Sequence, residues 1–365
     1  MKRREFLWSM PAAGVAAWSA MQAKPARLAV NRGAGAPGGW IDGLGEIHLD
    51  YDLKLVDEIR ASGLRGCVVT VGNPALQGPA AFDDMKREID GYDAHVKKHA
   101  DRFIRATRSA DIDTATERGR IALVYYTQNA SPIQDDLERL RLLYDAGVRI
   151  IQLTYNTRNL VGDGCLERTN TGLSTFGMAL VERMNEMGIL VDVSHCGPAT
   201  TLEGITASSK PVAITHAGCR AIYDHPRNKP DELLRALADR GGVIGIYQIN
   251  PYLGPKERNT LDDYLRHVDH AVKVAGIEHV GIGSDREHRR IPDTEEEKQK
   301  LIDELSRLRP TTSAIFRWPF FVSELNHPRR METIRDALGK RGYAEADVDR
   351  ILGGNFRRLF GDVLG

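Results

Sequence analysis

The segment "ILVDVSHCGPATTLEGITASSKPVAITH", residues 189–216, decides the fold that we expect for this chain. It holds two short apolar runs, Ile189–Ser194 and Pro211–Thr215, and each run is followed at once by a histidine, His195 or His216. Apolar runs of this length are typical of buried parallel strands. Because active-site residues of a parallel barrel lie at the carboxyl ends of its strands, both imidazoles are expected at one rim.

Short apolar runs alternate with longer amphipathic ones along most of the sequence. Two of the longer runs, Leu173–Met187 and Leu261–Ala275, repeat apolar residues at helical spacing. The predicted strands are Trp40–Ile47, Gly66–Val71, Ile121–Tyr126, Val148–Thr154, Ile189–Ser194, Pro211–Thr215, Gly242–Tyr247 and His279–Gly283, with a weaker ninth at Phe103–Thr107. Eight strands that alternate with helices predict an α/β fold, a (β/α)8 barrel of the TIM type. An open doubly wound sheet is the alternative, but "GLGEIHLD" lacks the G-x-G-x-x-G spacing of its phosphate turn.

The first 26 residues, "MKRREFLWSMPAAGVAAWSAMQAKPA", predict a twin-arginine export signal, because Arg3-Arg4 precedes Phe6-Leu7 and a short apolar run. That run is too short for a stable membrane anchor, so a periplasmic or secreted protein is expected. Residues 27–365 are predicted to form one barrel domain with an insertion around residues 286–325. Lys+Arg and Asp+Glu balance at 50 each, which argues against a nucleic-acid partner and leaves a homodimer open.

Polar residues follow almost every predicted strand, which is where the chemistry of a barrel resides. Two imidazoles and the carboxylate of Asp285 on one rim suit a zinc ion. The residues at the strand ends are Glu46 or His48, Asn73, Gln128 and Asn129, Tyr155 and Asn156, His195, His216, Tyr247 and Asp285.

Six segments then occur in a characteristic order. They are "LTYNTRN" (residues 153–159), "GLSTFGMALVERMNEMGILVDVSH" (172–195), "PVAITHAGCRAI" (211–222), "DHPRNKPDELLRAL" (224–237), "HVGIGSD" (279–285) and "ILGGNFRRLF" (351–360). Their order and spacing resemble those of the membrane dipeptidases, also called renal dipeptidases, which are zinc-dependent hydrolases with an amidohydrolase-like barrel. The resemblance spans nearly the whole chain after the export signal.

The resemblance implies roles for four residues. His195 and His216 would be ligands of one zinc ion, and Asp285 would be a metal-bound aspartate or, alternatively, the general base. Arg227 would grip the carboxylate of the substrate, since a planar guanidinium can contact a carboxylate through two hydrogen bonds. The function implied is hydrolysis of a small carboxylate-bearing substrate, a dipeptide-like amide or ester.

Two positions depart from the family pattern. The bridging glutamate of the family falls on Gln128, whose neutral amide would leave the repulsion between two metal ions uncompensated. The family's catalytic histidine falls on Tyr155, which can donate a hydrogen bond but cannot accept a proton near neutral pH. We predict that Tyr155 takes part in catalysis and that Gln128, Asn156 and Tyr247 contact the substrate.

The first predicted strand departs as well. Its sequence "WIDGLGEIHLDYD", residues 40–52, contains the triplet His48-Leu49-Asp50, which looks like a pair of metal ligands. Aligned through Asp42-Gly43 with the family's D-G-H-x-D, however, the histidine falls on Leu44 and the aspartate on Glu46. The triplet lies about 13 Å further along an extended chain. One zinc position is therefore expected to have lost its imidazole.

The sequence thus predicts a single divalent ion per chain, zinc or another metal. His195 and His216 are the expected ligands, with Asp285, Glu46 or water completing the shell, and His48 and Asp50 are alternative ligands. Three protein ligands and a water suffice for a hydrolytic site. Two other functions stay open, a lyase or isomerase that uses the metal and Tyr155, and a binding protein without turnover.

Overall fold

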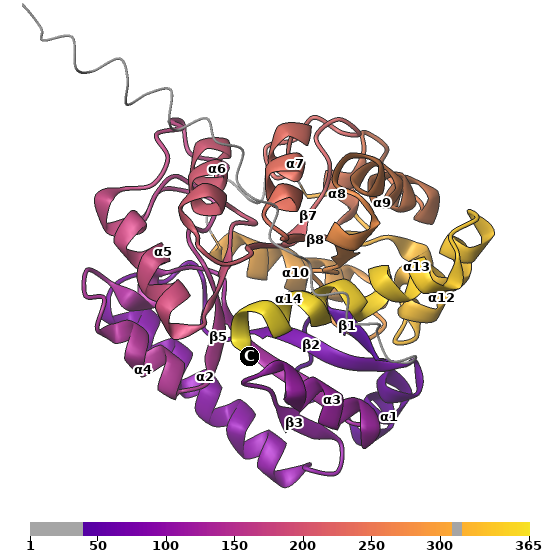
Figure 1. The fold of residues 1–365 in the computed structure, drawn as a ribbon. Helices are drawn as coiled ribbons and strands as arrows, with labels where there is room; N and C mark the ends of the chain where they lie inside the picture. Colours follow the sequence, from indigo (N-terminus) through magenta and orange to yellow (C-terminus); the bar gives the residue numbers. More distant parts are fainter. Residues whose placement is uncertain (1–38, 309–315) are drawn as a thin grey trace, which may run out of the picture.

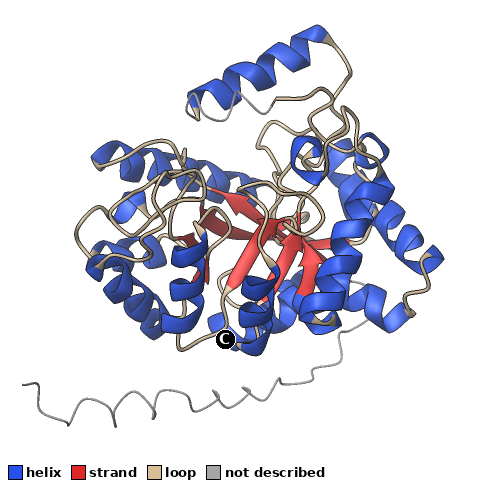
Figure 2. Ribbon diagram, turned by 90° about the horizontal axis from the view of Figure 1, so that it is seen from above, coloured by secondary structure: helices blue, strands red, loops and turns tan. Residues whose placement is uncertain are grey.

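The structure is a computed structural model that describes residues 39–308 and 316–365. The predicted export signal, residues 1–26, lies outside the described residues. The described strands form one sheet surrounded by helices (Figures 1 and 2). The strands are β1 (Trp40–Asp42), β2 (Leu64–Thr70), β3 (Phe103–Arg105), β4 (Ile121–Thr127), β5 (Val148–Gln152), β6 (Leu190–Asp192), β7 (Ala213–Ala217), β8 (Val243–Ile246) and β9 (Val280–Ile282).

Helices follow most of the strands. The α-helices are α1 (Leu53–Ala61), α2 (Pro79–Lys98), α3 (Ser109–Glu117), α4 (Arg139–Asp145), α5 (Thr175–Met187), α6 (Pro198–Ala207), α7 (Asp231–Asp239), α8 (Asn250–Leu253), α9 (Leu261–Ala275), α10 (Glu295–Arg307), α12 (Arg330–Lys340), α13 (Glu345–Asp349) and α14 (Asn355–Leu364). Shorter helical turns are η2 (Ser131–Ile133), η3 (Ile277–His279), η4 (Ser323–Leu325) and the π-helical η5 (Arg350–Gly354).

The sheet closes on itself. The strand order is β2-β1-β9-β8-β7-β6-β5-β4, and β4 pairs back with β2, so eight parallel strands form a ring. The predicted (β/α)8 barrel is therefore confirmed. The weaker ninth strand is also present, as β3, and it pairs with the first three residues of β4 while β5 pairs with the last three. It adds to the sheet without joining the ring.

The first strand is shorter than predicted. β1 ends at Asp42, whereas the apolar pattern predicted a strand as far as Ile47. Beyond Asp42 the backbone still follows its neighbours, since Gly45 N donates to Val68 O and Glu46 pairs with Glu287. The chain is therefore extended but irregular here, and two glycines next to Leu44 account for the loss of a regular ladder.

The lower interior of the barrel is closed by the last helix. Phe356 of α14 is fully buried and packs with Ile41, Val124 and other side chains that point into the ring. A Cβ atom on Gly43, just after β1, or on Gly281 of β9 would lie 2.2 or 2.7 Å from the Phe356 ring, so both positions need glycine. Figure 1 shows α14 crossing beside β1 and β2. With this end filled by side chains, the opposite end, where the strands terminate, is left for chemistry.

The segment after β9 carries α10, which Figure 2 shows beside the short grey trace, apart from the ring of helices. Thr294 caps α10 by accepting from Glu297 N, and three glutamates occupy its first turn, where the helix dipole favours negative charge. Among the described residues, no helix is both long and apolar enough to cross a membrane.

Candidate active site

His195 and His216 lie side by side at the ends of β6 and β7. Their ring centroids are 4.9 Å apart and both side chains are buried. Only the pair Asp192 and Ala213 is in register between these two strands. Beyond that pair the two ends are not held by a backbone ladder, so side chains must fix the distance between the histidines.

The carboxylate of Asp192 joins the two strand ends. It is fully buried and accepts from Ser194 N at 3.1 Å, Ser194 Oγ at 2.6 Å, Thr215 N at 3.0 Å and Thr215 Oγ1 at 2.9 Å. Tyr126 donates to it as well, at 2.6 Å. Since Ser194 and Thr215 each precede one of the histidines, a single carboxylate ties the two strand ends together.

The hydrogen bonds also assign the tautomer of each imidazole. Thr215 Oγ1 gives its hydrogen to Asp192, so it accepts from Nδ1 of His216 at 2.9 Å. Nδ1 of His195 lies 2.8 Å from the amide oxygen of Asn156, which can only accept. Both rings therefore carry hydrogen on Nδ1 and a lone pair on Nε2, and Nε2 of His216 is buried without a partner among the described residues. This is the form in which imidazole binds a metal.

Burial keeps both histidines neutral. It lowers the pKa of His195 and of His216 well below the usual range, and the Arg227 guanidinium lowers each further. The lone pairs on Nε2 are therefore available at neutral pH.

Asp285 reaches the same place from β9. Its Oδ2 lies 4.0 Å from Nε2 of His216. Its backbone is left-handed, with φ of 51°, a conformation that is uncommon outside glycine and is tolerated by Asp and Asn. Asp42 holds the preceding residue, because Ser284 donates to it from N at 2.8 Å and from Oγ at 2.5 Å. Burial raises the pKa of Asp285 to about 6, and the Arg227 guanidinium opposes that rise.

His216 and Asp285 are far enough apart to hold a metal ion between them. Two metal–ligand bonds of about 2.0–2.2 Å can together span the gap between His216 and Asp285. In the described part of the chain, however, no three His, Cys, Asp or Glu side chains already surround a common point as the ligands of a metal do. The side-chain ligands available to a metal ion here are Nε2 of His195, Nε2 of His216 and the carboxylate of Asp285. Water would occupy the remaining coordination positions.

Arg227 is attached to both histidine-bearing strand ends. Its side chain is buried and donates to the backbone oxygen of Ser194 at 2.8 Å and of His216 at 3.4 Å. Its guanidinium carbon lies 5.7 Å from the centre of the Tyr247 ring. The arginine predicted to bind the substrate carboxylate is thus held directly beside the imidazole pair.

The two predicted tyrosines are placed differently. Tyr155 stacks on His195, with ring centroids 4.3 Å apart. Burial and the nearby Asp285 raise the pKa of Tyr155, so its phenol stays protonated and can donate. The hydroxyl of Tyr247, predicted to contact the substrate, donates instead to Asn228 Oδ1. Tyr247 is fully buried and its ring lies beside Arg227. Because its hydroxyl already donates to Asn228, that hydrogen is not free for a substrate.

Near the end of β1, Gln128, Thr70 and Glu46 are joined by hydrogen bonds, and Leu44, close to Glu46 in the sequence, is buried. Gln128 Nε2 donates to Thr70 Oγ1 at 3.2 Å, and Thr70 also hydrogen-bonds the Glu46 carboxyl. Burial raises the pKa of Glu46 well above its usual range, and the charge of Asp285 adds to that rise. Leu44 is fully buried in the apolar interior of the barrel.

His48 and Asp50 are not brought to the imidazole pair. Both are exposed, and His48 Nε2 lies 4.0 Å from a carboxylate oxygen of Glu287. The chain has passed the barrel rim before it reaches them, so the alternative in which this triplet supplies ligands has no geometric support.

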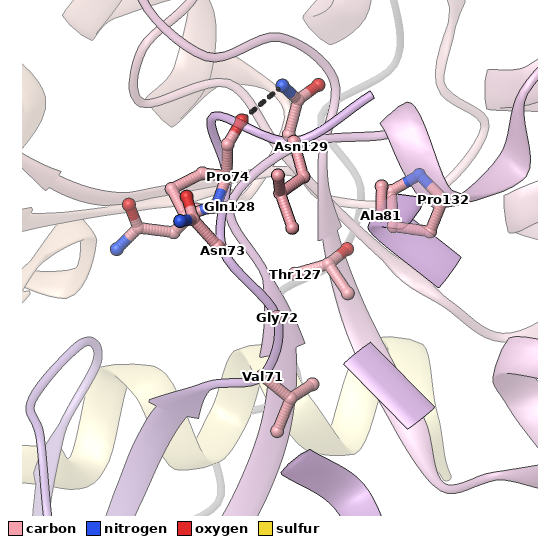
Figure 3. Close-up of a pocket in the computed structure, with 10 residues that line it drawn as sticks. Val71, Gly72, Asn73, Pro74, Ala81, Thr127, Gln128, Asn129 and Pro132 are labelled. Atoms are coloured by element: carbon pink, nitrogen blue, oxygen red, sulfur yellow. Dashed lines mark hydrogen bonds between the residues drawn. The ribbon is translucent and has the colours of Figure 1, made fainter. Parts of the chain in front are cut away.

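A small pocket lies next to Gln128, at the ends of β2 and β4 (Figure 3). Thr127, Asn129 and Asn73 line it, and Asn129 Nδ2 donates to Pro74 O at 2.9 Å. Figure 3 shows the Gln128 side chain pointing away from Thr127 and Pro132. Neighbouring residues of a strand face opposite sides, so much of this pocket lies behind β4 rather than among the histidines.

Sequence reasoning missed Asp192, Thr215 and Thr70. Asp192 and Thr215 hydrogen-bond each other beside the histidines, and Thr70 hydrogen-bonds Gln128. A signal was available for Asp192, because an acidic residue inside an otherwise apolar strand is rarely buried without partners.

The loop between β5 and α5 contacts the backbone of His195. Its Asp163 carboxylate accepts from Arg158 Nε at 2.6 Å and from the hydroxyls of Thr169 and Thr171 at 2.9 and 3.0 Å. The same loop supplies Cys165, whose N donates to His195 O at 2.7 Å. The buried carboxylate therefore stabilises a loop that contacts the site.

Acid is expected to weaken the protein through Asp163. The Arg158 side chain holds the pKa of Asp163 well below its usual range. Such a carboxyl stabilises the fold above its unfolded-state pKa of about 4, and that contribution is lost as the pH falls below it. We expect Asp163→Asn to lower the free energy of unfolding by about 1.5–3 kcal/mol at pH 7 and by less at pH 3. Urea titration at both pH values measures this, and equal losses would contradict the role.

Comparisons with known proteins identify a family and several relatives. The sequence model of the membrane dipeptidase family matches residues 45–315. Dipeptidase verJ of Clonostachys rogersoniana is 35% identical over 205 residues, 54% of this chain and 52% of that protein. An uncharacterized dipeptidase of Schizosaccharomyces pombe is 36% identical over 150 residues, 40% of this chain and 37% of that protein. The chain thus spans about half, or less, of the length of these curated relatives.

Solved structures are similar over nearly the whole chain. An amidohydrolase from Pseudomonas aeruginosa is 31% identical with a TM-score of 0.79, covering 90% of this chain and 97% of that one. A metallopeptidase described as dipeptidase AC has a TM-score of 0.72 at 18% identity, covering 90% of this chain and 99% of that one, and indicates the fold alone.

Proposed function

The chain belongs to the membrane dipeptidase family, and from that premise we propose that it is a metal-dependent hydrolase of a small carboxylate-bearing amide or ester. One observation carries the proposal. Two neutral imidazoles with free Nε2 lone pairs lie beside a buried guanidinium that is bonded to both of their strand ends. Such a site offers a metal and a carboxylate anchor within the reach of one small substrate.

The residues divide the work of hydrolysis. A divalent ion, for which zinc suits these ligands, would supply positive charge that polarises the scissile carbonyl and acidifies water. Arg227 binds the free carboxylate of the substrate and so fixes the position of the scissile bond. Asp285 takes the proton of the attacking water at its carboxylate, if it is the base rather than a ligand, and passes it to the leaving group. Tyr155 donates a hydrogen bond to the oxygen on which negative charge develops.

We propose a single ion per chain. Leu44 offers no donor atom where the family resemblance places a histidine. Thr70 links Gln128 to Glu46 by hydrogen bonds, in place of a charged carboxylate between two ions. Apart from the Glu46 carboxyl, whose pKa is raised by burial, a second cation there would meet a neutral amide and an apolar side chain, neither of which offsets its charge.

Export by the twin-arginine route, to the periplasm or beyond, is proposed from residues 1–26 alone. The absence of a nucleic-acid partner and the formation of a homodimer likewise stay predictions.

A substrate panel tests the proposed function. We expect zinc-loaded protein to cleave some members of a panel of dipeptides and N-acyl amino acids. Amidation of the substrate carboxylate is expected to lower kcat/KM by about 10–100-fold, since a hydrogen bond to a charged group contributes about 1.5–3 kcal/mol. Chelator-treated protein is the control. Absence of cleavage across the panel would overturn the hydrolase proposal, and indifference to amidation would overturn the role of Arg227.

A further inference from the structure

Lys229 is a buried lysine whose ammonium donates hydrogen bonds to the turn that carries His195. Its Nζ donates to Val193 O at 2.8 Å, to Cys196 O at 2.8 Å and to Thr201 Oγ1 at 2.9 Å. An ammonium has three hydrogens, and three oxygens accept them here. Two of those oxygens belong to the residues that flank Ser194 and His195 in the chain, so the side chain holds the turn from both sides.

The backbone of Lys229 is tied to the other histidine strand. Lys229 N donates to Gly218 O at 2.9 Å, and Lys229 O accepts from Arg220 N at 2.9 Å. Gly218 lies two residues after His216. One residue therefore connects the continuation of the His216 strand, through its backbone, to the His195 turn, through its side chain.

This connection lies where the sheet gives little support, because β6 and β7 share a single pair of residues in register. It is also costly, since a buried charge is unfavourable unless it is paired or fully hydrogen-bonded. Among the described residues, no carboxylate comes within 4.0 Å of the Lys229 ammonium. An apolar side chain would fill the same space without that cost. We therefore infer that the ammonium is present because its three hydrogen bonds fix the geometry of the turn.

We propose that Lys229 is a positioning residue that sets the separation and orientation of His195 and His216. The proposal deepens the metal-dependent hydrolase proposed above and rests on it, because the histidine pair is the proposed metal site. Lys229 acts through backbone carbonyls, and nothing places it in contact with the substrate.

Arg149 provides a matched control. It is also a buried cation that binds backbone oxygens, those of Thr107 at 2.9 Å, Tyr144 at 2.7 Å and Val148 at 2.9 Å. It lies near the start of β5, the end of the strand opposite to the site. Arg149→Met should therefore cost stability, as Lys229→Met does, without disturbing the histidines.

The first readout uses the full-length protein without metal. Nitrogen-15 NMR spectra of the imidazole rings report the tautomer of each histidine, with His195→Gln to assign one set of signals. In the wild type we expect His195 as the single tautomer with hydrogen on Nδ1. Lys229→Met is expected to shift or broaden the His195 signals, and Arg149→Met is expected to leave them in place.

The second readout is the affinity for Co²⁺, measured by titration of its visible absorption. Changes in the groups that orient metal ligands typically cost about 10–100-fold in metal affinity, and we expect a loss of that size in Lys229→Met. Thr201→Val, which removes one of the three acceptors, should show a smaller loss. It serves as the test variant if Lys229→Met does not fold.

The outcomes separate this inference from the proposed function. Imidazole signals in Lys229→Met, or in Thr201→Val as its substitute, that match those of Arg149→Met would overturn the positioning role. Wild-type protein that binds no Co²⁺ would overturn the metal site, while the imidazole spectra would still decide the role of Lys229.

Discussion

Replacing His216 with alanine is expected to abolish metal binding and to lower kcat/KM by about 10³-fold or more, because the ion contributes several kcal/mol of transition-state stabilisation. His216 is fully buried, and its Nε2 has no partner among the described residues. This nitrogen is therefore free to bind a metal ion. We expect wild-type protein loaded with zinc and dialysed to retain a single equivalent per chain by elemental analysis, and the variant to retain almost none.

His270→Ala is a suitable control for this experiment. That histidine pairs with Asp231 at 2.8 Å, between α9 and α7 outside the barrel ring, and its loss should leave the metal content unchanged. Two equivalents in the wild type would contradict the single-ion proposal. Full metal retention in His216→Ala would contradict its assignment as a ligand.

Asp285→Asn is expected to lower kcat by about 10²–10⁴-fold, the range that general acid–base catalysis typically contributes, with KM little changed. The fold should survive, because asparagine, like aspartate, tolerates a left-handed backbone. Steady-state kinetics and metal content, measured together, also distinguish the two roles left open for this residue. Retained metal with lost kcat indicates the base, and reduced metal indicates a ligand.

A surface variant sets the baseline for Asp285→Asn. Asp262→Asn lies in the first turn of α9, where the side chain is 74% exposed, and should leave kcat unchanged. If Asp285→Asn kept kcat within a few-fold of this control, Asp285 would be neither base nor essential ligand.

The barrel could be predicted because its strands are buried on both sides. β6, β7 and the other inner strands read as short apolar runs, and the residues that end them can be named without knowing the tertiary structure. That topology brings the strand ends that carry His195 and His216 next to each other, while side chains fix the distance between the two rings. The early end of β1 did not follow, since it depends on how Gly43 and Gly45 meet side chains from distant segments.

The state of the side chains could not be predicted in the same way. Both imidazoles carry hydrogen on Nδ1 because of their acceptors, Asn156 for His195 and Thr215 for His216. Thr215 can accept only because its own hydrogen goes to Asp192. Tyr247 was expected to donate to the substrate, but its hydroxyl meets Asn228, which is 19 residues away in the chain. Period and spacing locate a residue on a strand, whereas partners of this kind are fixed only when several loops pack together.

The packing of Phe356 against Gly43 and Gly281 has a consequence for biosynthesis. The aromatic ring that fills the barrel interior comes from α14, which follows every strand of the ring in the sequence, and the glycines that admit it lie just after β1 and in β9. A nascent chain cannot bury these surfaces until α14 has left the ribosome. Until then the open barrel is exposed to aggregation and proteolysis, and termination anywhere before residue 356 should leave it open.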